Sequence, residues 1–273
     1  MKRKARVLIR GGGDLASGVA ARLKRAGFDV LISELPHPLV VRRLVSFAEA
    51  VFSRTVQVEE ITGQLAENME EVQQILDQDK VAVLVDPDLA CLEPFSPLVL
   101  VDARMRKLSP EIGMEAAPLV IGLGPGFSAG ENCHAVVETM RGHLLGRVIW
   151  EGDALPNTGI PESVGGKAGE RVLRAPQDGV LKNSVAIGSV VIEGDVLAYV
   201  GETAVTAPFD GILRGMMQEG LAVKTGMKIG DLDPRSNPDY ARLISDKSLA
   251  IGGGVLEAIL TRKNIRDKIY ASD

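Results

Sequence analysis

The chain has 273 residues, of which 45% are hydrophobic and 25% charged, and its formal net charge is −5. This length predicts more than one domain with a buried core. The acidic balance argues against a nucleic-acid surface, and no apolar stretch approaches the roughly 18 residues of a membrane span. Cys91 and Cys133 stand in unrelated contexts and predict a reducing cytoplasm rather than a disulfide framework.

A strand, a glycine turn, a helix and a second strand are predicted at the start of the chain. Residues 6–9, in which three apolar residues follow Arg6, predict a strand. Apolar residues then recur at helical spacing from 14 to 26, up to Gly27, a residue type that commonly follows a helix end. Residues 29–34 predict the second strand. This order of elements winds a parallel sheet right-handedly.

The turn after the first strand has the spacing Gly11-x-Gly13-x-x-Ala16, which matches the glycine fingerprint of dinucleotide-binding sheets. Glu34 follows Gly13 by 34 − 13 = 21 residues, close to the roughly 20 expected for an acid that holds a ribose hydroxyl. We expect a bound nucleotide or phosphate ester, the alternative being a turn that serves only helix–strand packing. The predicted binding residues are Arg10, Gly11, Gly12, Gly13, Asp14, Ala16 and Glu34.

Asp14 stands where free helix N–H groups would point at a phosphate. Its carboxylate either caps the helix or repels the anion. A Mg²⁺ ion that bridges Asp14 to a phosphate would remove the conflict, and Arg10 would offset part of the charge.

Three further apolar runs predict buried strands of the same sheet, and each ends in a polar or glycine-rich corner: 81–85, 98–101 and 119–121. Ligands of open α/β sheets bind beyond such carboxyl ends. Asp102 and Arg104 are therefore candidate catalytic residues, the alternative being a salt bridge at the strand end.

A second glycine loop contains Gly122, Gly124 and Gly126. It forms either the far wall of a site for a long phosphate-bearing ligand or a plain turn into a helix predicted at 131–141. Another helix is predicted at 67–76. The three histidines lack metal-ligand spacing, so no metal site is expected.

The second half contains an internal repeat. Residues 175–179 recur as 207–211, a spacing of 207 − 175 = 32 residues. Two copies of one strand–turn–strand unit predict a small β-sandwich about a pseudo-twofold axis, which resembles the biotinyl/lipoyl-type barrel. The hairpin at 199–204 has no lysine, so we expect no lipoyl or biotin and a structural or docking role.

The predicted fold class is an α/β Rossmann-like parallel sheet domain plus a small all-β barrel-sandwich domain. Glycines 252–254 lie in the helical tail and indicate close packing or a loop ahead of a helix near 255–269. The predicted domains are a nucleotide-binding domain at 1–152, a linker or wrapping loop at 153–169, the barrel at 170–235 and the helical tail at 236–273.

Three stretches carry a resemblance to a known family: RGGGDLASGVAARLKRAGFDVLISELPHPLVVRR, IGLGPGFSAGENCHAVVETMRGHLLGRVIWEGDALPNTGIP and IGGGVLEAIL. They resemble the YqeB family, described as accessory components of selenium-dependent molybdenum hydroxylase systems. The first half also resembles the Rossmann domain of XdhC-type maturation factors. Here Gly13 precedes Asp14, where XdhC-type loops tend to have histidine, so ligand identity does not transfer.

The resemblance implies a maturation protein that binds a nucleotide or molybdenum-pterin cofactor and meets a molybdenum hydroxylase or other maturation proteins. The sequence leaves a homo-oligomer open. Two alternatives are an NAD(P)-dependent oxidoreductase and a non-catalytic structural partner protein. The oxidoreductase alternative lacks a recognisable proton relay.

Overall fold

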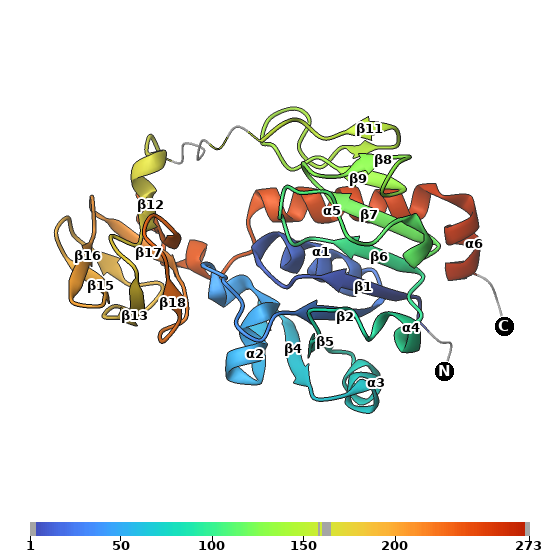
Figure 1. The fold of residues 1–273 in the computed structure, drawn as a ribbon, viewed down its shortest axis with the longest axis horizontal. Coiled ribbons are helices and arrows are strands. Elements are labelled where there is room, and N and C mark those ends of the chain that lie inside the picture. The colour runs from blue at the N-terminus through green and yellow to red at the C-terminus, as the bar shows by residue number, and fades with distance from the viewer. Residues whose placement is uncertain (1–3, 158, 160–164, 271–273) are drawn as a thin grey trace. The chain divides into compact units, whose positions relative to one another are not determined.

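The computed structural model describes residues 4–157, 159 and 165–270. Residues 158 and 160–164 of the predicted linker lie outside this description. The chain forms two compact units (Figure 1). Unit 1 consists of Met1–Pro36, Phe47–Asn157 and Ile244–Asp273, and unit 2 of His37–Ser46 and Thr158–Leu243.

Unit 1 is built on a nine-stranded sheet with the order β10-β9-β7-β6-β1-β2-β5-β4-β3. Neighbours from β4 to β9 run parallel, whereas β3 and β10 pair antiparallel at the two edges. The strands are β1 (Arg6–Arg10), β2 (Asp29–Glu34), β3 (Thr55–Val58), β4 (Ile61–Ala66), β5 (Val81–Val85), β6 (Val99–Asp102), β7 (Leu119–Leu123), β9 (Ala135–Val137) and β10 (Val148–Ile149). A separate antiparallel pair joins β8 (Ser128–Ala129) to β11 (Gly152–Asp153).

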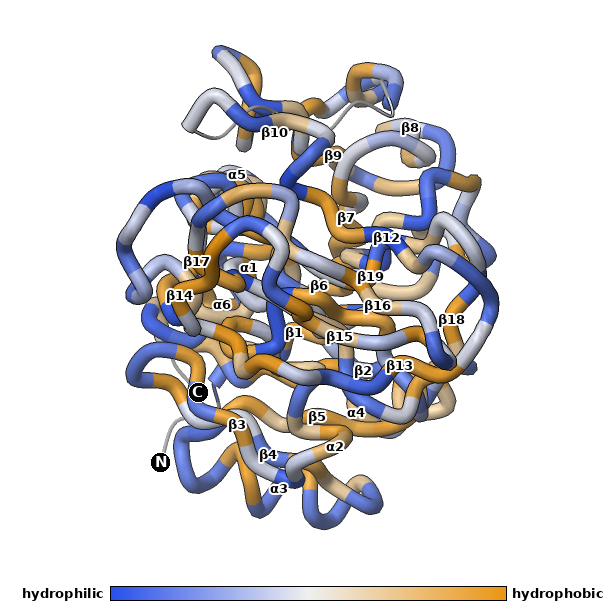
Figure 2. Tube along the Cα trace, turned by 90° about the vertical axis from the view of Figure 1, so that its left-hand side faces the viewer, coloured by the Kyte–Doolittle hydropathy of each residue, from blue (hydrophilic) through white to orange (hydrophobic). Residues whose placement is uncertain are grey.

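Six helices accompany these strands in the described part of unit 1: α1 (Asp14–Arg25), α2 (Ala50–Ser53), α3 (Met69–Asp77), α4 (Leu92–Phe95), α5 (Asp246–Thr261) and α6 (Lys263–Tyr270). Apolar residues of α3 and α4 form one buried cluster with alternate residues of the central strands, which face the same side of the sheet. Helix α5 lies along α1 (Figure 1). Apolar residues also run along the central strands in Figure 2.

The opening strand–turn–helix–strand unit is confirmed. β1 and β2 pair in parallel with Arg6 opposite Asp29, and α1 lies between them in the chain. Gly27 adopts a φ of +88°, the left-handed conformation that glycine takes readily after a helix end. The strands expected from the three later apolar runs are present as β5, β6 and β7.

The helix predicted at 131–141 is wrong. That segment contains β9, in which Val136 and Val137 are buried and pair in parallel with β7. β-Branched residues suit a pleated, buried strand better than a helix. The glycine loop before it therefore leads into a short strand pair rather than a helix.

The predicted fold class, a Rossmann-like parallel domain plus a biotinyl/lipoyl-like barrel, is wrong as stated. The sheet of unit 1 is mixed, because the hairpin of β3 and β4 extends one edge and β10 closes the other. Val56 and Val58 alternate with exposed residues in β3, a pattern typical of an edge strand, and this hairpin was not predicted. The strands of unit 2 form two separate antiparallel sheets rather than one barrel sheet.

The internal repeat of unit 2 is present in the structure. The strands of the first copy are β13 (Gly179–Asn183), β14 (Val190–Val191) and β15 (Val196–Val200), and those of the second are β17 (Gly211–Met216), β18 (Ala222–Val223) and β19 (Lys228–Asp233). Corresponding strands begin 32 residues apart. With β12 (Val172–Arg174) and β16 (Thr203–Thr206) they form two four-stranded sheets, β12-β19-β17-β14 and β16-β15-β13-β18.

Each copy lends a strand to the other's sheet, because β14 pairs with β17 and β18 pairs with β13. The two sheets match strand for strand under the 32-residue shift, as a pseudo-twofold relationship requires. Neither copy would be complete alone.

No helix in the described part of the chain combines the length and the apolar character needed to cross a bilayer.

Candidate functional site

Polar residues at the ends of the parallel strands lie in one row across the sheet. Arg10 stands opposite Ser33 of β2 on one side and Asp102 of β6 on the other, and Asp102 stands opposite Gly122 of β7. Parallel strands bring their carboxyl ends to the same edge. The polar strand ends predicted from the sequence therefore lie side by side at the carboxyl ends of β1, β6 and β7.

Asp102 and Arg104 form the ion pair that the sequence left as an alternative to catalysis. Arg104 donates from Nη2 to Asp102 Oδ2 at 2.6 Å and from Nε to Asp102 Oδ1 at 3.0 Å. Arg10 Nη1 lies 3.8 Å from the same carboxylate, and both Arg10 and Asp102 are buried. Gly11 lies next to Arg104 and has a φ of +92°, a backbone conformation that side chains rarely adopt.

Arg106 and the carboxylate of Glu111 complete the group. Glu111 Oε2 accepts hydrogen bonds from Arg10 Nη1 at 3.1 Å and from Arg104 Nη2 at 2.8 Å, and Glu111 Oε1 accepts one from Arg106 Nη1. We call Arg10, Arg104 and Arg106, with Asp102 and Glu111, the arginine cluster. The Glu111 side chain is 49% exposed, so the cluster opens to solvent at this carboxylate.

The arginine cluster contains more positively than negatively charged groups. Burial and then the neighbouring charge of Arg104 lower the pKa of the Arg10 guanidinium from its ordinary value, although Asp102 opposes the shift. Three guanidiniums face two carboxylates in this network. Arginine stays protonated in proteins, so the positive charges persist at all ordinary pH values.

Two N–H groups of the first glycine loop, those of Gly11 and Gly12, are occupied by the protein itself. Gly12 N–H donates to Glu34 Oε2 at 2.7 Å, and Leu35 N–H donates to Glu34 Oε1 at 2.7 Å. Gly11 N–H donates to the Ser33 carbonyl at 2.8 Å. The acid predicted to hold a ribose hydroxyl therefore holds the backbone of its own turn.

The remaining residues of the first loop serve helix packing. The carbonyl of Gly13 accepts the Ser17 N–H at 2.8 Å and begins α1, and Ala16 is buried within that helix. Asp14 Oδ1 accepts a hydrogen bond from Ser248 Oγ at 2.9 Å, which ties the start of α1 to α5. A cation at Asp14 stays a prediction.

The second glycine loop is filled by neighbouring residues. A Cβ at Gly122 would overlap the ring of Phe127, one at Gly124 would overlap the Thr139 side chain, and one at Gly126 would lie 2.8 Å from the Leu108 carbonyl oxygen. Gly124 and Gly126 also have φ angles of +69° and +106°, which side chains rarely adopt. Close packing in a turn accounts for glycine at these positions, and the far wall of a ligand site stays a prediction.

Glu111 and Arg106 were missed by the sequence analysis. They belong to residues 103–113, which form neither helix nor strand and include Met105 and Lys107 with positive φ angles. A usable signal was an acidic residue followed by two arginines directly after a buried strand, where Asp102, Arg104 and Arg106 are spaced by two.

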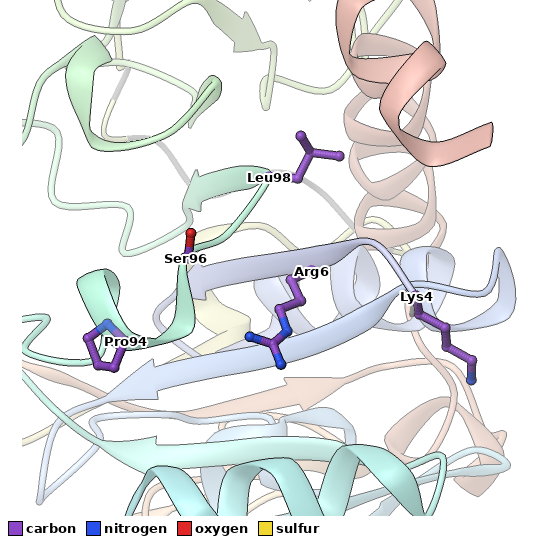
Figure 3. Close-up of a pocket in the computed structure, with 5 residues that line it drawn as sticks. All are labelled: Lys4, Arg6, Pro94, Ser96 and Leu98. Carbon is purple, nitrogen blue, oxygen red and sulfur yellow. The ribbon is translucent and has the colours of Figure 1, made fainter. Parts of the chain in front are cut away.

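A polar pocket lies at the amino ends of β1 and β6, away from the arginine cluster (Figure 3). Its volume is about 330 Å³, and Lys4, Arg6, Pro94, Ser96 and Leu98 line it. Its cations already have protein partners, since Lys4 Nζ lies 2.6 Å from Asp79 Oδ1 and Arg6 Nη1 donates to the Phe95 carbonyl at 3.0 Å. Among the described residues, no group of three or more histidine, cysteine or acidic side chains is placed to hold a metal ion.

Among solved structures, the chain is similar to a succinylglutamate desuccinylase from Silicibacter sp. TM1040 (14% identity, TM-score 0.25, 84% of each chain covered). It is also similar to an aspartoacylase family protein from Mesorhizobium loti (11%, 0.28, 85% of this chain and 86% of that chain). A third is a succinylglutamate desuccinylase/aspartoacylase from Rhodobacter sphaeroides (13%, 0.27, 84% and 85%). At these TM-scores the likeness assigns no activity to this chain.

The predicted function is corrected by these findings. The three solved structures named above bear desuccinylase and aspartoacylase names, and not that of a maturation factor of a molybdenum hydroxylase. Glu34 already accepts the Gly12 N–H, and the phosphate-holding role of the glycine loops, on which both the maturation and the NAD(P) alternatives depended, stays a prediction.

No family model matches the chain. A curated relative, the uncharacterized protein YqeB of Escherichia coli K12, is 47% identical over 254 residues, which are 93% of this chain and 47% of the relative. The chain thus spans about half the length of that relative. The resemblance to YqeB proteins that the sequence predicted is supported over nearly the whole of this chain.

Proposed function

We propose that this protein binds a small anionic molecule, with a carboxylate or a phosphate as the recognised group, at the arginine cluster. The observation that carries the proposal is the convergence of the Arg10, Arg104 and Arg106 guanidiniums on the half-exposed carboxylate of Glu111. A carboxylate held in this way has the shape and charge of the proposed ligand.

The geometry favours recognition rather than a surface ion pair. Arg10 is buried, and Asp102, also buried, fixes Arg104 through two parallel hydrogen bonds. Such forked pairing positions a guanidinium at little further entropic cost when an anion arrives. Exposed single ion pairs, by contrast, contribute about 0–1 kcal/mol and fix little.

The position in the sheet supports the same proposal. The cluster lies beyond the carboxyl ends of β1 and β6, and β1 has β2 on its other side. The chain leaves β1 for β2 in one direction and reaches β6 in the other, so the strand order reverses here. Ligands of open α/β sheets bind at such points.

The experiment is calorimetric titration of the full chain with inorganic phosphate and with acetate, compared between the native sequence, Arg104→Gln and Arg106→Gln. Arg106→Gln removes a guanidinium that contacts Glu111 while leaving the Asp102 pairing in place. We expect affinity to fall at least about tenfold for Arg104→Gln, which corresponds to about 1.4 kcal/mol, and less for Arg106→Gln.

Arg25→Gln is the matched control, because Arg25 also contacts two glutamates, Glu59 and Glu60, but lies away from the sheet edge. Its affinity should equal that of the native chain. Equal binding by all the variants would contradict the proposal. A cytoplasmic location, which the unrelated sequence contexts of Cys91 and Cys133 led us to expect, remains part of the same proposal.

A further inference from the structure

The carboxylate of Glu111 connects an irregular segment of the chain to the arginine cluster. Its segment, 103–113, forms neither helix nor strand. Two of its non-glycine residues, Met105 and Lys107, have φ angles of +56° and +61°, a conformation that costs free energy and persists only where other contacts hold it. The contacts of the Glu111 carboxylate with three arginines are among those that hold this segment.

We infer that Glu111 is a displaceable internal counter-ion, and that the ligand it yields to is a dianionic group. This inference rests on the proposed anion binding at the same cluster. The Glu111 carboxylate occupies the three guanidiniums when the site is empty of ligand, and it leaves when an anion enters.

Charge balance selects the ligand class. Among the groups in direct contact, three positive charges face two negative ones while Glu111 is in place, and the charge of Asp86 also acts on Arg10. A monoanion that replaces Glu111 restores the same balance, so it gains little while competing against a tethered group of high effective concentration. A dianion neutralises the cluster fully. Phosphate monoesters and small dicarboxylates share this chemistry.

The displacement lowers the apparent affinity for every anion by one common factor, the fraction of molecules in which Glu111 has left. Removing its charge should remove that factor. The preference for a dianion should remain, because it arises from the guanidiniums and Asp102 rather than from Glu111.

The test uses methyl phosphate and methyl sulfate, which share shape and differ by one charge at about pH 8, since the second pKa of a phosphate monoester is near 6. Malonate and acetate form the corresponding carboxylate pair and distinguish a phosphate from a dicarboxylate ligand. Each is titrated into the full native chain, Glu111→Gln and Glu115→Gln, at about 0.1 M ionic strength, where screening acts over about 10 Å.

Glu115→Gln is the matched control. Glu115 lies close in the chain and is exposed, but its carboxylate accepts from Gly113 N–H at 3.3 Å rather than from an arginine. Thermal melting checks that each variant is folded.

We expect Glu111→Gln to bind both members of a pair at least about fivefold more tightly, by a similar factor, with Glu115→Gln unchanged. The native chain should prefer the dianion. Unchanged or weaker binding by Glu111→Gln, with binding still lost in Arg104→Gln, would overturn the displacement and leave the proposed function standing. Absence of anion binding in both the native chain and Glu111→Gln would overturn the proposed function itself.

Discussion

Glu34 Oε2 accepts a hydrogen bond from the backbone N–H of Gly12 at 2.7 Å, across the turn that follows β1. The same carboxylate accepts the Leu35 N–H through its other oxygen. The acid thus closes the turn from which the fingerprint predicted an open phosphate site. The recognisable spacing of Gly11, Gly13 and Glu34 has a structural explanation in this protein.

Glu34→Gln should destabilise the protein although it removes a buried charge. Glutamine offers one acceptor oxygen where two N–H groups need one each, so either Gly12 or Leu35 is left facing an NH₂ group. We expect the free energy of unfolding to fall by about 1–3 kcal/mol in urea denaturation. Glu60→Gln, which changes an exposed residue, should cost little, and an equal loss in both variants would contradict the role of Glu34.

The free energy of unfolding should depend on pH through the titration of Glu34. Burial raises the pKa of this carboxyl above its ordinary value of 4.5. Between 4.5 and the raised value the native state binds more protons than the unfolded chain, so the contribution of Glu34 to stability falls as pH rises through that interval. Urea midpoints measured across this interval should show that slope in the native chain, and Glu34→Gln should lack it.

The contribution of His134 to the free energy of unfolding should instead increase as pH rises. Its Nδ1 accepts the Val120 N–H at 3.0 Å, so Nε2 carries the proton of the neutral ring. Burial and then the charge of Arg262 lower the pKa of His134 from 6.5. The unfolded chain therefore binds more protons below pH 6.5, and this contribution to stability is lost as pH falls through the folded pKa.

An NMR titration of His134 checks this directly. Arg262→Gln should bring the pKa part of the way back towards 6.5, since Arg262 is the second cause of the shift. A native His134 pKa at or above 6.5 would rule the explanation out.

Gly252 and Gly253 of α5 should differ sharply in how well they tolerate substitution by alanine. A Cβ at Gly252 would lie 2.6 Å from the Gly18 carbonyl oxygen of α1, whereas one at Gly253 would meet nothing within 4 Å among the described residues outside the local helix backbone. We expect Gly252→Ala to destabilise by about 1–3 kcal/mol through overpacking and Gly253→Ala to stabilise by up to about 1 kcal/mol through helix propensity. Thermal or urea unfolding measures both, and equal effects would contradict the close helix approach.

The sequence predicted well where one local pattern decides the structure. The apolar runs of β1, β2, β5, β6 and β7 and the 32-residue repeat were recognised because period and spacing are visible in one dimension. The close packing indicated by the glycines of the tail is confirmed at Gly252.

The failures have a common physical cause. β9 was taken for a helix because its buried character depends on pairing with β7, which no pattern within the segment itself indicates. The glycine fingerprint fixes a backbone shape but not the side chain that fills it, so the Glu34 contact was invisible. Glu111 joins the arginine cluster through a turn with positive φ angles at non-glycine residues, a conformation that few sequence signals indicate.

The central claim is that the guanidiniums of Arg10 and Arg104 receive an anion in place of Glu111. The most direct measurement is a crystal structure of the full chain grown with methyl phosphate. The account predicts the phosphate oxygens within hydrogen-bond distance of both guanidiniums and the Glu111 carboxylate turned away from them. Glu111 still paired with the three arginines, with no methyl phosphate among them at saturating concentration, would contradict it.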